Sequence, residues 1–93
     1  MPKGEVATLL ATASVDLDEI AKRLTAALDS GDADQARKAA HKIRGIAASF
    51  AAPRAADLAR RLEEAGEAIS DLGAQLATCT TETAKLLRKA AVA

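Results

Sequence analysis

Apolar residues recur every three or four positions along nearly the whole chain, the period at which one face of an α-helix is presented. The first stripe comprises Val6, Leu9, Leu10, Ala13, Leu17, Ile20, Leu24 and Leu28. Asp16 and Glu19 form a capping-box pattern within it, so this region is either one continuous helix or a short N-terminal helix followed by a second. Gly31 followed by Asp32 predicts the end of this region and the N-cap of the next helix.

Three further stripes predict three further helices. The helix expected over 33–50 has an apolar face of Ala36, Ala39, Ala40, Ile43, Ile46, Ala47 and Phe50. Pro53 favours a new helical start, and the face of that helix comprises Ala55, Leu58, Leu62 and Ala65. Gly66 marks a break. The last stripe steps by three and four, as bundle seams do, through Ile69, Leu72, Leu76, Cys79, Thr83, Leu86 and Ala90.

Amphipathic helices joined by short connections pack best as an antiparallel bundle. The pattern therefore predicts an all-α fold, an up-down-up-down four-helix bundle, with a short extra N-terminal helix as the variant of it. Composition agrees, because alanine is abundant, Phe50 is the sole aromatic residue and β-branched residues are few. The length of 93 residues predicts one domain spanning 1–93.

Charge and cysteine usage exclude several classes of protein. Thirteen basic and thirteen acidic residues balance, which gives no reason to expect nucleic-acid or membrane binding. Cys79 has no disulfide partner and no metal-ligand companions, so no metal site is expected and a reduced, cytoplasmic setting is. Lys3, the run Val6–Leu10 and Ala11–Ala13 resemble a signal peptide faintly, but the run is short and Glu5 interrupts it.

The candidate chemistry centres on His41. At 100° per residue, His41 lies opposite the apolar stripe of its helix and should face solvent. Gly45 lies one turn away on the same face, where a glycine weakens the helix by ~1 kcal/mol relative to alanine. Basic residues share or flank this face, namely Arg37, Lys38, Lys42 and Arg44. An exposed histidine among solvated charged residues is usually a polar surface residue without a specific function. The glycine in the middle of this helix favours a functional role for His41.

These residues carry a family resemblance. The run Ala40–Phe50 resembles the signature of histidine phosphotransfer domains, which has His, an aliphatic residue two on, Lys or Arg three on, Gly four on, and small residues before a large apolar one. The segment 52–63 is similar to the next helix of that family. Two positions depart from the pattern: Ala51 stands where a glycine is common, and Glu63 where a glutamine is common.

The resemblance implies a function for each residue of this face. His41 would accept a phosphoryl group, with Arg44 and Lys42 stabilising the transferred oxygens. Glu63 would accept a hydrogen bond from the imidazole and orient it, or else serve as a surface partner of Arg60 or Lys38. Partner binding would fall on Lys38, Gly45 and Ala48.

The resemblance also implies the partners. These are response-regulator receiver domains, which would supply Mg²⁺ and the acceptor aspartate, and a hybrid sensor histidine kinase. The chain would be a monomeric phosphoryl carrier with no cofactor and no kinase activity of its own, since it lacks a nucleotide-binding loop.

Two alternatives stay open at this point. One is a helical docking module that binds a receiver or kinase without carrying phosphate. The other is a structural or regulatory helical subunit in which His41 is incidental. A hydrolase, nuclease or metalloenzyme lacks the residues for a site, because the chain has one histidine, one cysteine and scattered carboxylates.

Overall fold

The chain forms four α-helices in the computed structural model, which describes residues 3–50, 52–65 and 69–92. They are α1 (Lys3–Ser30), α2 (Ala33–Ser49), α3 (Pro53–Glu64) and α4 (Ile69–Val92). The described residues contain no strand. The all-helical prediction is therefore confirmed.

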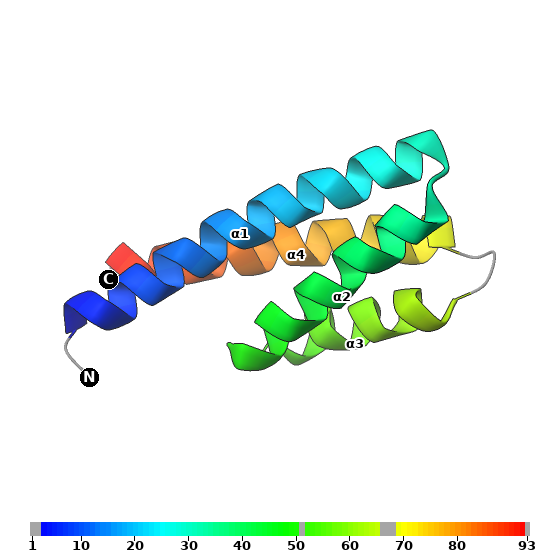
Figure 1. Ribbon diagram of the computed structural model, residues 1–93. Coiled ribbons are helices and arrows are strands. Elements are labelled where there is room, and N and C mark those ends of the chain that lie inside the picture. The colour runs from blue at the N-terminus through cyan, green and yellow to red at the C-terminus, as the bar shows by residue number, and fades with distance from the viewer. Residues whose placement is uncertain (1–2, 51, 66–68, 93) are drawn as a thin grey trace.

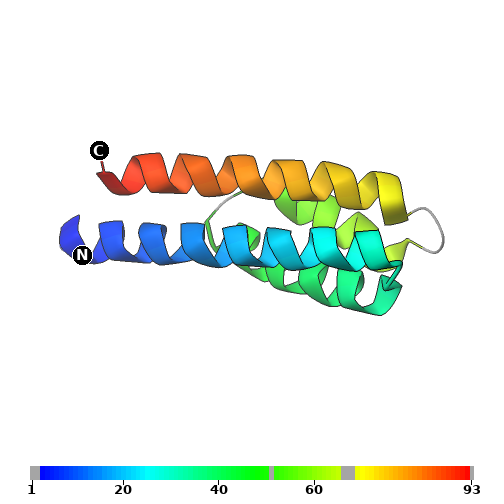
Figure 2. The same cartoon turned by 90° about the horizontal axis from the view of Figure 1, so that it is seen from above.

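Neighbouring helices run antiparallel and close a ring (Figures 1 and 2). α1 packs against α2 and α4, and α3 packs against α2 and α4, whereas α1 and α3 lie on opposite sides of the ring and do not touch. This is the predicted up-down-up-down bundle. It places α2, which carries His41, between α1 and α3.

α1 is one continuous helix of 28 residues, so the short separate N-terminal helix does not form. Asp16 and Glu19 lie inside it, with the backbone helical on both sides. The helix ends as predicted at Gly31, whose φ of 71° suits glycine. The Gly31 and Asp32 N–H groups donate to the carbonyls of Leu28 and Ala27, at 3.2 and 2.8 Å, which is the Schellman arrangement.

The starts of α2 and α3 also follow the predicted signals. The Asp32 carboxylate caps α2 by accepting from the Gln35 N–H at 3.1 Å. Pro53 occupies the first turn of α3, and α3 ends at Glu64. Ala51 and the predicted break at Gly66 lie outside the described residues, as does the side chain of Ile69.

The core is built from a few large side chains embedded among alanines. The large apolar residues with at most 1% of their surface exposed are Leu17, Leu24, Ile43, Leu62 and Leu76. Cys79 is buried as a small apolar residue, as expected from its place in the stripe. Gly73 permits a close approach of α4 to α1, because a Cβ there would lie 2.5 Å from Leu28 Cδ1. The alanines and this glycine bring the helices close together.

The predicted apolar faces are wrong at one end of the bundle. Leu86 is 67% exposed and Ala90 is exposed, and the buried face of α4 passes instead through Thr80 and Ala84. Leu9 of the first stripe is 51% exposed.

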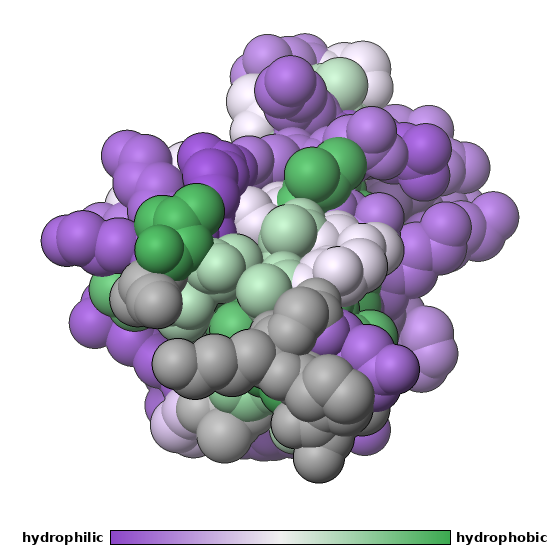
Figure 3. All heavy atoms as spheres, turned by 90° about the vertical axis from the view of Figure 1, so that its left-hand side faces the viewer, coloured by the Kyte–Doolittle hydropathy of each residue, from purple (hydrophilic) through white to green (hydrophobic). Residues whose placement is uncertain are grey.

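One physical reason is the rotation of α4, which turns Ala84 and Leu87 to the core and Leu86 away from it. The other is length, because α2 and α3 have 17 and 12 residues against 28 and 24 in α1 and α4. Past the shorter pair, α1 and α4 have no helices to cover those faces (Figure 1). Seen end-on, apolar residues lie among the polar side chains of this end (Figure 3).

Candidate functional site

The imidazole of His41 projects from the middle of α2 into solvent. Its side chain is 77% exposed, while its neighbours Ala39, Ala40 and Ile43 are buried. The helical period thus predicted its orientation correctly. A nucleophile in this position is accessible to a large partner.

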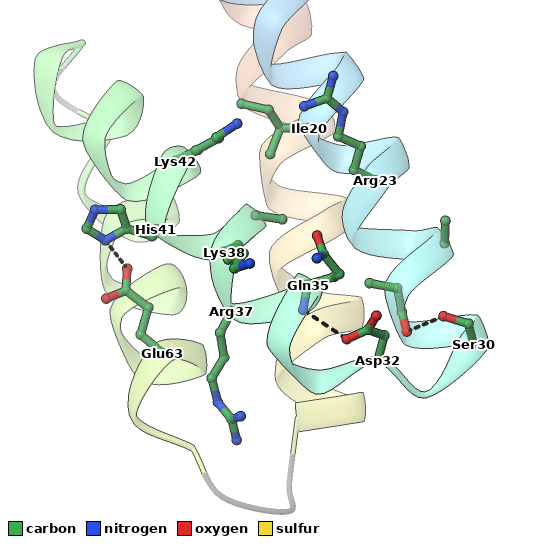
Figure 4. A pocket seen from close by; sticks show the side chains of 13 residues that line it. Ile20, Arg23, Ser30, Asp32, Gln35, Arg37, Lys38, His41, Lys42 and Glu63 are labelled. Atoms are coloured by element: carbon green, nitrogen blue, oxygen red, sulfur yellow. Dashed lines mark hydrogen bonds and ion pairs between the residues drawn. The ribbon is translucent and has the colours of Figure 1, made fainter.

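Glu63 of α3 joins His41 to Arg44 (Figure 4 shows the histidine contact). Glu63 Oε1 lies 3.3 Å from His41 Nδ1, and Oε2 accepts a hydrogen bond of 3.0 Å from Arg44 Nη1. The Glu63 side chain is only 20% exposed, and Oε1 is shielded from solvent and accepts no hydrogen bond from the described residues. The carboxylate therefore faces the ring and the guanidinium from a largely desolvated position.

The other proposed partners of Glu63 are not its partners. Arg60 contacts Asp57 at 2.9 Å and Glu64 at 3.1 Å on the outer face of α3. That hydrogen bond from Arg60 holds the pKa of the Asp57 carboxyl below its usual range. Of the two alternatives predicted for Glu63, the structure thus favours the contact with the imidazole.

Gly45 leaves open space on the His41 face. No heavy atom lies within 4 Å of a Cβ placed on Gly45, and Ala48, one turn further on, is exposed. A partner can approach the ring closely across these two positions. The predicted docking residues therefore form one surface with His41.

The comparison with protein families decides what this face belongs to. The family model described as Hpt domain matches residues 7–90. The chain belongs to the Hpt domain family. No curated protein and no solved structure matches it. Hpt domains take part in phosphotransfer in two-component signalling, and they interact there with receiver domains and kinases.

The Hpt domain also has grooves between α1 and α2, with His41 at their edge. Lys38 and Lys42 line one groove together with Arg23 and Ile20 of α1 (Figure 4). Neither lysine forms an ion pair with another described residue. Arg23 was missed by the sequence analysis, since only tertiary packing brings it beside α2.

A second groove extends the same surface along α1. It is lined by Leu9, Ile46 and Phe50 as well as by His41 and Gly45. Ile46 and Phe50 are half-buried, so the apolar stripe of α2 reaches the surface here. The His41 face thus combines positive charge with exposed apolar area.

Arg37 has a structural contact within the Hpt domain. Its Nη2 donates to the Ala65 carbonyl at 2.9 Å, which ties α2 to the end of α3. Among the described residues, no group of three or more His, Cys, Asp or Glu could hold a metal ion. No helix in the described part of the chain is long and apolar enough to cross a membrane.

Proposed function

We propose that this Hpt domain relays a phosphoryl group between receiver aspartates through phosphohistidine at His41. The observation that carries the proposal is the position of the ring, exposed on α2 with Nδ1 held at Glu63. Nδ1 facing a carboxylate favours the tautomer with the proton on Nδ1. Nε2 then carries the free lone pair and points away from α3 into the space where a partner docks.

The transfer of the phosphoryl group to His41 requires no additional proton carrier. The Nε2 lone pair attacks the phosphorus of an aspartyl phosphate, the N–P bond forms, and the P–O bond to the aspartate breaks. The aspartate leaves as a carboxylate, and the positive charge that develops on the ring is stabilised by Glu63. The reverse sequence passes the group to a second aspartate.

Positive charge on this face assists the transfer, since phosphoryl transfer depends on positioning and charge stabilisation. Lys42 is the proposed cation for the transferred oxygens, and Arg44 is the second cation of the face. Lys38, Gly45 and Ala48 belong to the docking surface. The receiver is proposed to supply Mg²⁺ and the acceptor aspartate, as the resemblance to the family implies.

The rest of the proposal follows from this role. Residues 1–93 act as a single carrier domain that works as a monomer in the cytoplasm, between a hybrid sensor histidine kinase and its receivers. It carries phosphate and does not itself use ATP. The nearly complete match to the family model, over 7–90, supports the single-domain assignment.

The deciding experiment mixes the protein with phosphorylated receivers and Mg²⁺ and follows phosphate onto it. The parent should gain acid-labile, base-stable phosphate, and His41→Gln should gain none while folding normally, because exposed substitutions usually change stability by less than ~0.5 kcal/mol. Lys85→Gln is the control, since it removes an exposed lysine from α4, which lines neither groove beside His41.

Labelling of the His41→Gln protein would exclude His41 as the acceptor. If the parent binds receivers but never takes up phosphate, the docking-module alternative replaces the proposal.

A further inference from the structure

We propose that Arg44 is a positioning residue that acts through Glu63: it neutralises the carboxylate that holds His41, and so keeps the ring in its nucleophilic, unprotonated form. This inference rests on the proposed function of His41 and adds a role for a second residue. It gives Arg44 and Lys42 different roles, with Lys42 as the cation that stabilises the phosphoryl oxygens.

The geometry gives Arg44 a partner other than phosphate. Its Nη1 donates to Glu63 Oε2 at 3.0 Å, while the opposite carboxylate oxygen contacts the ring at 3.3 Å. The Arg44 side chain is 49% exposed, and the side chain of Glu63 is 20% exposed. A guanidinium tied to a largely buried carboxylate is not free to follow the oxygens of an incoming phosphoryl group.

The carboxylate has two opposing effects on the ring. Its Oε1 lies 3.3 Å from Nδ1 and favours the tautomer with the proton there, which leaves the lone pair on Nε2. It also favours uptake of a second proton, and the doubly protonated ring has no lone pair with which to attack phosphorus. A glutamine, common at this position in the family, would have only the first effect. A charge of +1 beside Glu63 cancels much of the second effect and leaves the first intact.

Other charged groups line the grooves that His41 borders. They are Asp16, Glu19 and Arg23 of α1, Arg37, Lys38 and Lys42 of α2, and Asp32, the N-cap before α2. No residue of α4 lines these grooves. Among all of them, the Glu63 carboxylate is the charged group that lies against the ring, with Oε1 3.3 Å from Nδ1.

The chain offers a direct readout, because His41 is its only histidine. The ring can be titrated by NMR in the free protein, with no receiver present. Arg44→Ala should move the midpoint of this titration to higher pH, by about half a unit to one unit, since the carboxylate is then uncompensated. Glu63→Gln should move it to lower pH, and Arg44→Lys should leave it near that of the parent.

The double variant Arg44→Ala/Glu63→Gln completes the cycle. Without the carboxylate, Arg44 has nothing to neutralise, so the upward shift caused by Arg44→Ala should disappear. If Arg44→Ala leaves the midpoint unchanged, or if the upward shift persists in the double variant, the counter-ion role is wrong. Arg44→Gln, which also removes the positive charge but keeps a long polar side chain, gives the same test if Arg44→Ala fails to fold.

Phosphotransfer rates separate this role from direct contact with phosphate. A counter-ion predicts that Arg44→Ala slows transfer by about 2-fold at pH 7 and regains the parental rate at alkaline pH. Contact with the oxygens predicts a loss of about 10-fold or more at every pH, with or without Glu63. The titration needs no transfer at all, so failure of the proposed function and failure of this inference give different results.

Discussion

Gly45 has no side chain, and this leaves the surface next to His41 open. It lies one turn from His41 on a solvent-facing helix, where nothing in the packing requires a glycine. Its φ is not in the left-handed region, unlike that of Gly31. Glycine makes the helix less stable than alanine would at this position. Its advantage is therefore the space that it leaves for a partner approaching the His41 ring.

A graded pair of substitutions tests this. Gly45→Ala adds one methyl group into open space, so it should stabilise the fold by up to ~1 kcal/mol and leave transfer nearly unchanged. Gly45→Gln should also fold but should slow transfer at least several-fold, because its side chain extends over the docking surface. The measurements are thermal unfolding and the rate of phosphate uptake. Equal rates for the two variants would remove the steric role of Gly45.

At this scale the sequence predicted directions but not contacts. The exposure of His41 follows from the period of α2 alone, and it is confirmed. The pairing of Glu63 with Arg44 depends on the rotation of α3 against α2, which no local pattern specifies. The sequence therefore left Glu63 with two interpretations, and the structure places its carboxylate beside His41 and Arg44. Arg23 escaped notice for the same reason.

At the scale of the elements, the predicted apolar stripe of α4 includes residues that no neighbouring helix covers. Of the residues predicted for this seam, Leu76 and Cys79 are buried, at 0% and 9% exposed, but Leu86 is 67% exposed. The periodicity is the same at both places. What differs is the face of α4 that its neighbours cover, because Ala84 is fully buried and Leu87 packs against the core, whereas Leu86 lies on the uncovered side. The period of one helix does not specify how that helix is rotated against its neighbours.

Two leucines of that seam make a matched comparison. Leu76→Ala should destabilise the protein by about 2–5 kcal/mol, because Leu76 is fully buried in the core. Leu86→Ala removes the same atoms from an exposed position and should change stability by less than ~0.5 kcal/mol. Chemical denaturation of both variants measures the difference. Equal costs would mean that α4 is rotated relative to the structure described here.

At the scale of the whole molecule, the bundle is a rod of 45 × 20 × 16 Å whose two ends differ in construction. At the end that contains Gly31, four helices enclose a core. At the end where α1 begins and α4 finishes, two helices lie side by side alone (Figure 2). The fold class could be read from the four stripes, but this asymmetry required the relative lengths of helices in contact.

A small polar cluster stands near the boundary between the two parts. Arg88 of α4 donates to the Ser14 hydroxyl through Nε at 3.2 Å and pairs with the Asp18 carboxylate. Ser14 is 1% exposed, so this link between α1 and α4 is partly shielded from water. It joins the paired helices at the level where the covering by α2 and α3 ends.

This construction implies a gradient of local opening along the rod. In a helix pair with few buried contacts, backbone amides exchange with solvent through local openings that cost little free energy. In a packed core, amides exchange only when the whole domain unfolds. Deuterium uptake should thus be fast for amides up to about residue 10 and from about residue 86, and slowest around Leu24 and Leu62. Uniform protection along α1 would contradict this. His41 lies in the four-helix part, where slow exchange is expected, so the ends of α1 and α4 can fray repeatedly while the part of α2 around His41 keeps its shape.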